Sequence, residues 1–378
     1  MRRTLIAAAK FALVTLVSLA ALEILVRAYI FDPSVPYIRT PGWRILVRHN
    51  DLLPHVSGDN HFIEINRLGL RGVLPPAQAK PLIAVLGGST AEDWVLPEQK
   101  TWAKQLQQTV RSCAPDAFAA NLGKGGVNAR HHLLQLPETA GYMPDFDVYV
   151  VLMGLNDFLF DLRIHHPFEL PPNWWRRQAF MSDRYDEGYS AVYALAKRLF
   201  KLYRAGSANA SGPISDFGLY MEGLWKAYRN VKQDQWVNEL PDLTAHLVTY
   251  RETIRKLKAF ADARKKPIVF VTQPYVWSDS MSPETRAQIY AGFIGSDISS
   301  PKTKWYTSAA LEKGVSSYND ALREMCKTEN LVCVDVARLL PREAKYYYDD
   351  FHFSEGGSTE LGRMIGNEIK KLVCRRPE

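Results

Sequence analysis

The stretch Pro81-Leu-Ile-Ala-Val-Leu86, with the turn Gly87-Gly88-Ser89-Thr90 directly after it, decides the fold class of this chain. A short apolar run of this kind is typical of a strand that is buried on both faces, as strands of parallel sheets are. The two glycines then let the backbone turn sharply. A buried strand that leads through a turn into a helix is the repeating unit of an α/β domain.

The same alternation of strands and helices continues to the C-terminus. We expect further strands at residues 118–122, 147–153, 267–272 and 331–336, and helices at residues 101–111, 243–264, 316–327 and 354–373. Parallel strands need crossover helices, and this order of elements supplies them. The sequence therefore predicts an α/β domain with a mainly parallel sheet, whose ligand site lies beyond the carboxyl ends of the strands.

Polar motifs suited to acyl transfer follow three of the predicted strands. Ser89 lies in the first turn, where helix N-terminal amides favour a developing anion, although Gly-Gly-Ser-Thr is also an ordinary turn sequence. Glycines in the segment Asn121–Gly126 let a backbone N–H approach a ligand closely. Asn156, in Gly154-Leu-Asn-Asp157, offers a side-chain amide as a second donor. Either of the last two motifs can also be only a turn.

A histidine beside carboxylates precedes the last predicted helix, in the motif Asp349-Asp350-Phe351-His352. An imidazole can take the proton of a serine hydroxyl, and an aspartate can hold its tautomer and orientation. The alternative is an ordinary surface loop histidine, since the chain contains nine histidines. The position of all four motifs favours a functional role. Three follow predicted strands, the fourth precedes the last predicted helix, and they occur in this order along the chain.

These four motifs resemble the four blocks of the SGNH hydrolases, also called GDSL-like hydrolases. The resemblance covers roughly residues 60–375, apart from an insertion that we expect at residues 158–240. The first block departs from the commonest version, because Gly88 stands where an aspartate is usual. The segment 66–72 also looks like an upstream element of exported bacterial members. The resemblance implies a flavodoxin-like three-layer α/β/α domain without metal or organic cofactor. It further implies Ser89 as nucleophile, His352 as general base, Asp349 rather than Asp350 as its orienting carboxylate, and Ser89, Gly126 and Asn156 as the oxyanion hole.

The N-terminus has a different composition from the rest of the chain. After Arg2 and Arg3 comes an apolar run, residues 4–22, that is interrupted only by Lys10 and is about long enough to cross a bilayer. We expect an uncleaved signal anchor, while a signal peptide cut near residues 20–21 and a buried helix of the domain are alternatives. The positive-inside tendency then gives an inner-membrane anchor with a periplasmic or extracellular domain, although Arg27, Arg39 and Arg44 weaken the bias.

The chain divides into an anchor at residues 1–30, a tether and irregular lead-in at 31–80, and the hydrolase domain at 81–375. Residues 158–240 are too long for a simple connection, so we expect a helical insertion there. It contains Trp174-Trp175 and an amphipathic basic stretch at residues 193–203. These aromatic residues can pack within the insertion, or they can form a lid that binds sugar or lipid.

Charge and metal-ligand patterns exclude other classes of function. The 47 basic and 40 acidic residues are spread along the chain, so nucleic-acid binding, which needs a concentrated basic patch, is not expected. The cysteines form no CxxC pair and have no nearby histidine partners, which argues against a zinc site. His131-His132 and His165-His166 lack metal-ligand spacing with carboxylates, and we interpret both pairs as loop residues.

The flavodoxin-like arrangement implied by the resemblance also suggests a disulfide pattern. There the first and last helices of the domain cover the same face of the sheet, so that Cys113 and Cys374 can be bridged, which leaves Cys326 and Cys333 for a second bridge. Four buried free thiols are the alternative.

The reaction implied is hydrolysis of an ester through an acyl-enzyme. Within the family, substrates include O-acetylated polysaccharides, lipid esters and thioesters. For an anchored, exported enzyme we expect an acylated small-molecule or polysaccharide substrate, first of all O-acetyl groups on cell-envelope or exported glycan. Two alternatives are an acetyltransferase that uses the same serine, histidine and aspartate, and a catalytically silent protein that binds glycan or scaffolds an envelope complex.

Overall fold

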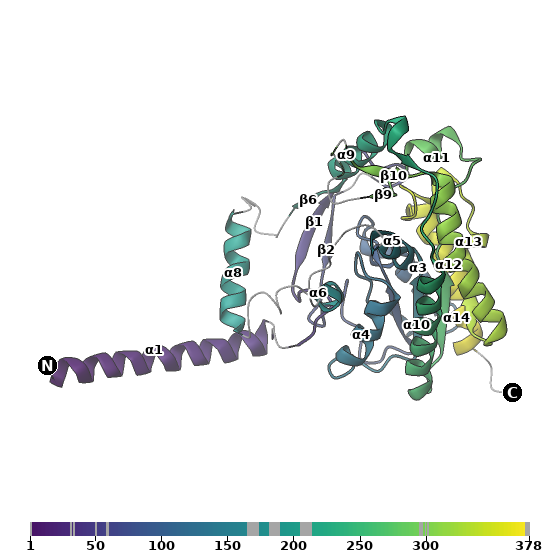
Figure 1. The fold of residues 1–378 in the computed structure, drawn as a ribbon. Helices are drawn as coiled ribbons and strands as arrows, with labels where there is room; N and C mark the ends of the chain where they lie inside the picture. Colours follow the sequence, from purple (N-terminus) through teal and green to yellow (C-terminus); the bar gives the residue numbers. More distant parts are fainter. Residues whose placement is uncertain are drawn as a thin grey trace.

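The computed structural model describes residues 2–30, 32, 35–49, 51–57, 60–164, 174–180, 190–204, 214–294, 298, 300 and 302–374. Its centre is a parallel sheet in the order β11-β8-β5-β3-β4 (Figure 1). The strands are β3 (Leu82–Gly87), β4 (Phe118–Asn121), β5 (Val148–Met153), β8 (Ile268–Thr272) and β11 (Val332–Val334). Numbered along the chain and read from the β4 edge, the order is 2-1-3-4-5, which is that of flavodoxin-like domains. The predicted fold class is confirmed.

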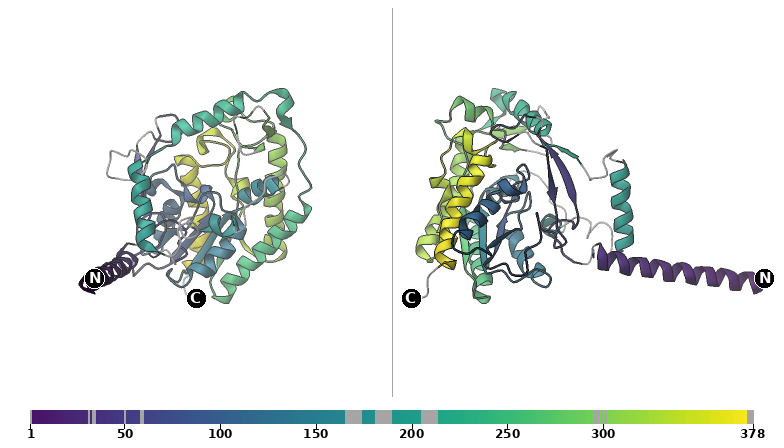
Figure 2. Two further views of the ribbon diagram at one scale, coloured as in Figure 1. Left: turned by 60° about the vertical axis from the view of Figure 1, so that its left-hand side comes forward. Right: turned by 180° about the vertical axis from the view of Figure 1, so that it is seen from behind.

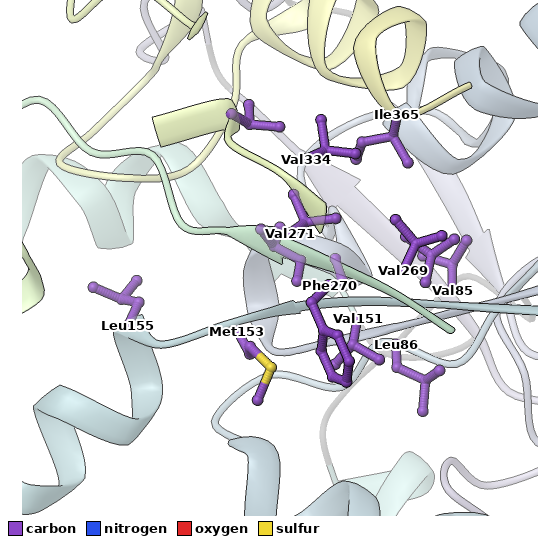
Figure 3. Close-up of a cluster of buried hydrophobic side chains, with 14 of the residues drawn as sticks. Val85, Leu86, Val151, Met153, Leu155, Val269, Phe270, Val271, Val334 and Ile365 are labelled. Carbon is purple, nitrogen blue, oxygen red and sulfur yellow. The ribbon is translucent and has the colours of Figure 1, made fainter. Parts of the chain in front are cut away.

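Apolar strands explain why this sheet is central. Every residue of β3, β5 and β8 is buried, because both faces of the sheet are covered by helices. In register, Val85 of β3 lies beside Val150 of β5, and Val150 lies beside Val269 of β8. Figure 3 shows Val85, Val151 and Val269 among the side chains of this core.

Helices cover the sheet in two layers. On one side α3 (Trp102–Arg111) packs against α14 (Glu355–Val373). The other layer contains α4 (Ala129–Thr139), α10 (Thr244–Ala263) and α12 (Ser308–Thr328), with α5 (Leu155–Ile164) against α12. The first layer is unusually close, since a Cβ atom at Gly362 of α14 would lie 2.7 Å from the Trp102 carbonyl oxygen of α3.

Two expectations on local structure were wrong. The helix expected near residue 316 begins at Ser308, because Thr307 caps it by accepting the Ala310 N–H, and it continues through Gly314 against the ring of Phe158. His131 and His132 lie in α4 rather than in a loop, and both are buried. His131 takes part in the cap of this helix, because its Nδ1 accepts the Asn128 N–H at 3.0 Å. His165 and His166 lie outside the described residues.

The segment before residue 81 is more ordered than a tether. It contains β1 (Arg44–Arg48) and β2 (His61–Glu64), which form a small sheet with β6 (Ile214–Asp216). Alternating apolar residues in these strands bury one face of that sheet. Arg71 then enters the main domain, where its guanidinium donates to the carbonyls of Glu92, Asp93 and Leu96. The segment therefore packs on the domain beside the end of β3.

The remaining elements lie in the insertion and in the connections between the central strands and helices. They are α2 (Ser89–Glu92), α6 (Trp174–Ala179), α8 (Ala191–Arg204), α9 (Phe217–Arg229), α11 (Pro283–Ala287), α13 (Val336–Leu339), the strands β7 (Trp236–Val237), β9 (Phe293–Ile294) and β10 (Lys304–Tyr306), and short 3-10 helices at Glu98–Lys100, Gln233–Gln235 and Ala344–Tyr346. Strand β10 joins β7 and β9 in a second small sheet. The described parts of residues 158–240 are mainly helical.

The N-terminal helix α1 (Arg2–Tyr29) projects away from the domain (Figures 1 and 2). Its segment Ile6–Tyr29 is long and apolar enough to cross a membrane, and most of its large apolar side chains face outward. A core helix of a soluble domain would bury such side chains. The alternative of a buried domain helix is therefore wrong.

Both expected disulfides are present. Cys113, just after α3, is bonded to Cys374 at the end of α14, and Cys326 is bonded to Cys333. The two Cα atoms of each bridge are 6.1 Å apart. The alternative of four free thiols is wrong, since none of the four cysteines is free.

Candidate active site

Ser89 is the first residue of the one-turn helix α2, directly beyond β3. The turn before it is tight: Gly87 has a φ of 158°, and a Cβ atom there would lie 2.6 Å from the Cβ of Ala91. Glycine is therefore needed at residue 87 for α2 to begin immediately at the strand end. This geometry places Ser89 at the edge of the sheet where β3 and β5 meet.

His352 and Asp349 complete a continuous chain of hydrogen bonds with Ser89. The Nε2 atom of His352 is 2.8 Å from the Ser89 hydroxyl, and its Nδ1 atom is 2.7 Å from Oδ2 of Asp349. The second oxygen of Asp349 accepts the backbone N–H groups of Phe351 and His352, at 2.9 and 2.8 Å. Asp349 is thus fixed by its own loop with one oxygen directed at the imidazole.

Asp350 has a different role from Asp349, although the two residues are adjacent in the chain. Its carboxylate points the other way and accepts the indole N–H of Trp277 at 2.7 Å and the backbone N–H of Tyr290 at 2.7 Å. Burial, together with the nearby charge of Asp349, raises the pKa of Asp350 to about 7. Asp350 therefore joins the 350 loop to the 277–290 segment, while the imidazole is hydrogen-bonded to Asp349.

Aromatic rings hold the imidazole of His352 in its plane. The ring of Tyr348 stacks parallel to it, with centroids 5.5 Å apart, and the ring of Phe351 packs at 4.6 Å. These contacts leave the imidazole little freedom to rotate. The site is therefore ordered before any ligand arrives, as an acyl-transfer site must be.

The loop after β4 brings Gly126 to the same edge. Its left-handed backbone, with a φ of 75°, favours glycine. The loop is held by Glu92, whose carboxylate accepts the Gly125 N–H at 2.6 Å and forms an ion pair with Arg39. A Cβ atom at Gly125 would lie 3.9 Å from the Cβ of Ser89, so the loop passes close to the serine.

Asn156, on the first turn of α5, lies against the residue before the serine. Its Nδ2 atom donates one hydrogen bond to the Val127 carbonyl at 2.6 Å, which leaves its second amide hydrogen for another acceptor. A Cβ atom at Gly88 would lie 2.2 Å from this Nδ2 atom. The glycine that replaces the usual aspartate of the first block thus makes room for the Asn156 amide.

A buried carboxylate also fixes the loops behind Asn156. Asp157 accepts the backbone N–H groups of Gly154 and Ala129, each at 3.2 Å, and so joins the end of β5 to the start of α4. Burial, followed by the nearby charge of Asp161, raises the pKa of Asp157 to about 7. This residue lies in the third block but its bridging role was not predicted.

Three further residues of the site were missed by the sequence reasoning. Glu92 and Asp93 follow Ser89 by three and four residues, so they lie one helical turn beyond the serine. This spacing was the sequence signal that pointed to them. Asp93 is buried, accepts the Trp102 N–H at 3.0 Å and the Ser358 hydroxyl at 3.2 Å, and has its pKa raised to about 7 by burial. Gln178 of α6 donates to the Gly125 carbonyl at 3.2 Å, and no sequence motif pointed to it.

The aromatic pair of the insertion lies near this loop. The ring of Trp175, next to Gln178 in α6, packs against the ring of His131 at 5.0 Å. Trp175 therefore packs on α4 of the main domain, and the choice between packing and a lid stays a prediction. Within the described ranges, no group of three or more His, Cys, Asp or Glu side chains is arranged to hold a metal ion.

Comparisons with known proteins give a family for this chain and several solved structures that are similar to it. The GDSL-like Lipase/Acylhydrolase family matches residues 85–359. A search of curated proteins gave no match. Similar solved structures include a protein described as a lipolytic member of the G-D-S-L family from Desulfitobacterium hafniense DCB-2, with 9% identity, a TM-score of 0.40 and coverage of 76% of this chain and 99% of that one. An alpha/beta hydrolase from the metagenome of Lake Arreo, Spain, has 13% identity, a TM-score of 0.39 and coverage of 79% and 98%. An acetylxylan esterase from Geobacillus stearothermophilus has 11% identity, a TM-score of 0.39 and coverage of 79% and 96%.

Proposed function

The chain belongs to the GDSL-like lipase/acylhydrolase family and is a serine hydrolase of the SGNH type, and on that premise we propose that Ser89, His352 and Asp349 hydrolyse an ester through an acyl-enzyme. The observation that carries this assignment is the continuous chain of hydrogen bonds from Asp349 through His352 to the Ser89 hydroxyl, at 2.7 and 2.8 Å. Each atom is within the reach that proton transfer needs.

In the first step, the Ser89 oxygen attacks the ester carbonyl carbon while Nε2 of His352 takes the hydroxyl proton. Asp349 stabilises the imidazolium and keeps Nε2 directed at the serine. The tetrahedral intermediate collapses when the bond to the alcohol oxygen breaks and His352 gives its proton to that oxygen. The products of this half-reaction are the free alcohol and an acyl group on Ser89.

The developing oxyanion needs donors on the opposite side of the carbonyl. We assign the backbone N–H groups of Ser89 and Gly126 and the free amide hydrogen of Asn156 to this task. Support comes from the Asn156 amide lying against residue 88 and from the Gly125–Gly126 loop passing beside Ser89. Glu92 and Gln178 position the loop through hydrogen bonds to Gly125.

In the second half-reaction, water attacks the acyl carbon and His352 accepts its proton. The ester bond to Ser89 then breaks, and the proton returns from His352 to the serine oxygen. A carboxylic acid leaves and the resting site is restored. A sugar hydroxyl in place of water would make the same site an acyltransferase.

We propose O-acetyl groups on cell-envelope or exported polysaccharide as the substrate, and an inner-membrane anchor with the domain in the periplasm. Support for the anchor comes from α1, whose segment Ile6–Tyr29 is long and apolar enough to cross a membrane. With Arg2 and Arg3 inside, the domain faces outward.

The test of the mechanism uses a serine-reactive fluorophosphonate probe on full-length protein in membranes. Wild type and the control Ser112→Ala, which changes an exposed serine, should be labelled, and Ser89→Ala should not. Labelling of Ser89→Ala at the wild-type level would refute the assignment. Acetate release from an O-acetylated glycan, against acetyl transfer to a second glycan, then separates hydrolase from transferase.

The test of location uses a periplasm-dependent reporter fused to the C-terminus, which should give signal. The protein should stay in the membrane fraction after a high-salt wash, and removal of residues 1–30 should release it. Recovery of the full-length protein in the cytosolic fraction would overturn both the anchor and the compartment.

A further inference from the structure

We infer that α8 is a second membrane contact, which lies along the surface of the lipid bilayer at the point where α1 leaves it. This inference rests on the proposed anchoring of α1. It goes further, because it names a separate surface of the domain and its partner, an anionic lipid bilayer. Three observations carry it: how α8 is joined to α1, how it runs, and which of its side chains face outward.

The first observation is the junction between the two helices. The carboxylate of Glu23 in α1 accepts the N–H groups of Ala191 and Val192, at 2.7 and 3.0 Å, and the Ser190 hydroxyl at 3.0 Å. These are the N-terminal donors that α8 cannot satisfy within itself. A carboxylate at a helix N-terminus is also favoured by the helix dipole. Glu23 therefore caps α8 and fixes its start to the side of α1.

The charged residues of α1 indicate where this junction lies relative to the membrane. The stretch Phe11–Leu22 contains no charged residue, and Glu23 directly follows it. Glu23 also forms an ion pair with Arg27, one turn later, at 2.8 Å. Such groups are costly in hydrocarbon and belong at the boundary with water. The start of α8 therefore lies at the membrane interface, and the domain lies beyond it.

The direction of α8 matches a helix that lies flat. In Figure 1, α8 begins beside the C-terminal part of α1 and runs away from it at a steep angle, and the right-hand view in Figure 2 shows the same arrangement. A helix that crosses a membrane-spanning helix at a steep angle runs along the plane of the membrane. In Figure 1 the rest of the domain lies on the other side of α8 from the N-terminus.

The side chains of α8 are distributed as such a helix requires. Ala191 and Ala194 face the protein and are fully buried, and Ala194 packs with Tyr37. Two large apolar residues are exposed instead: Leu199 is 57% exposed and Tyr193 is 56% exposed, while Leu195 is partly buried beside Ala194. A helix of a soluble domain normally buries its large apolar residues and exposes the others. The exposure of Tyr193 and Leu199, beside the buried alanines, fits an apolar medium over the outer face of α8.

The composition of α8 indicates the chemistry of that medium. Its sequence AVYALAKRLFKLYR has four basic residues and no acidic one, among leucines and aromatic residues. Interfacial helices combine these two features, since apolar side chains enter the boundary of the acyl chains while basic groups attract anionic headgroups. A protein partner would need no such charge and no link to α1. The surface therefore fits phosphatidylglycerol-containing lipid.

The experiment places an environment-sensitive fluorophore on single introduced cysteines, which is feasible because the four native cysteines are disulfide-bonded. Leu199→Cys probes α8, Leu16→Cys probes the span, and Val248→Cys on α10, which is 51% exposed, is the matched control for an exposed apolar residue. Each full-length variant is reconstituted into phosphatidylcholine and phosphatidylglycerol vesicles, and its thermal unfolding midpoint is compared with that of the wild type.

Labels at residues 16 and 199 should shift their emission to the blue, be quenched by brominated lipid and be protected from aqueous iodide, and the label at 248 should show the opposite. If the label at 199 behaves like that at 248 while the label at 16 is lipid-buried, the inference is wrong and the anchor stands. A blue shift at 199 without quenching by lipid would mean that another copy of the chain covers α8, which also overturns it. If the label at 16 is exposed to iodide, both the anchor and the inference fall.

Discussion

The imidazole Nε2 of His352 lies 2.8 Å from the hydroxyl of Ser89, although 263 residues separate them in the chain. The topology explains this approach. Ser89 follows β3, the strand at the switch point of the 2-1-3-4-5 sheet, and His352 precedes α14, which packs on α3, the helix between β3 and β4. Two elements that are first and last in the domain are thus neighbours, and their loops meet at one edge.

The first prediction concerns this pair. Ser89→Ala and His352→Ala should each remove nearly all esterase activity, and the double variant should be no slower than either single one, because the two residues act as a unit. Turnover of a short acyl ester, with circular dichroism to confirm folding, measures this. The control is His55→Ala, a histidine remote from the hydrogen-bond chain, which should keep wild-type turnover. Full activity of purified Ser89→Ala would contradict the mechanism.

The second prediction tests the oxyanion donor. Asn156→Ala should lower kcat by roughly 10²- to 10³-fold, the loss expected for one donor in a site that excludes water. KM should change much less, because the interaction strengthens only in the transition state. Labelling by a fluorophosphonate should slow but persist. A wild-type kcat would show that the amide does not face the oxyanion.

Gly88 gives the third prediction, because its missing side chain makes room for Asn156. Gly88→Asp restores the commonest residue of the first block, yet its Cβ would lie 2.2 Å from the Asn156 Nδ2 atom. The amide must move, so Gly88→Asp should lose at least as much kcat as Asn156→Ala. In the double variant the two losses should not add, because both remove the same interaction. If Gly88→Asp is as active as wild type, the two residues are not coupled.

Residues that follow strands were predictable from sequence, and residues that support them from elsewhere were not. Ser89, Gly126 and Asn156 follow apolar runs, so the topology rule alone brings them to one edge. Gln178 and Arg39 reach the same loop from segments without strand periodicity, and only tertiary structure shows their contacts. The pair His131-His132 was assigned to a loop because it lacks metal-ligand spacing with carboxylates, whereas both side chains are buried in α4, and burial lowers their pKa values and keeps them neutral.

The fourth prediction follows from that burial. Desolvation lowers the pKa of His132 from 6.5 to about 4. The unfolded chain therefore binds a proton that the folded chain does not, and the stability due to neutral His132 is full above pH 6.5 and is lost as the pH falls toward 4. The slope is about 1.4 kcal/mol per pH unit for one group. Urea unfolding between pH 7 and pH 4.5 should show a shallower loss in His132→Gln than in wild type. Equal slopes would mean that His132 is protonated in the folded state.

The last prediction concerns the two disulfides, which close loops of very different length. Cys113 and Cys374 are 261 residues apart, whereas Cys326 and Cys333 are 7 apart. In the chain-entropy model the first bridge contributes about 5.6 kcal/mol and the second about 2.4 kcal/mol, and strain or residual denatured structure can only reduce what is measured. Replacing both members of each pair by serine avoids a free thiol.

Urea unfolding of the two double variants in detergent, followed by tryptophan fluorescence, should show the larger loss of unfolding free energy for Cys113→Ser/Cys374→Ser. The first bridge also fastens the end of α14 to α3, the helices that bring His352 to Ser89, so proteolysis should cut this variant first near its C-terminus. A larger loss in Cys326→Ser/Cys333→Ser would show that loop length does not set the contribution of these bridges.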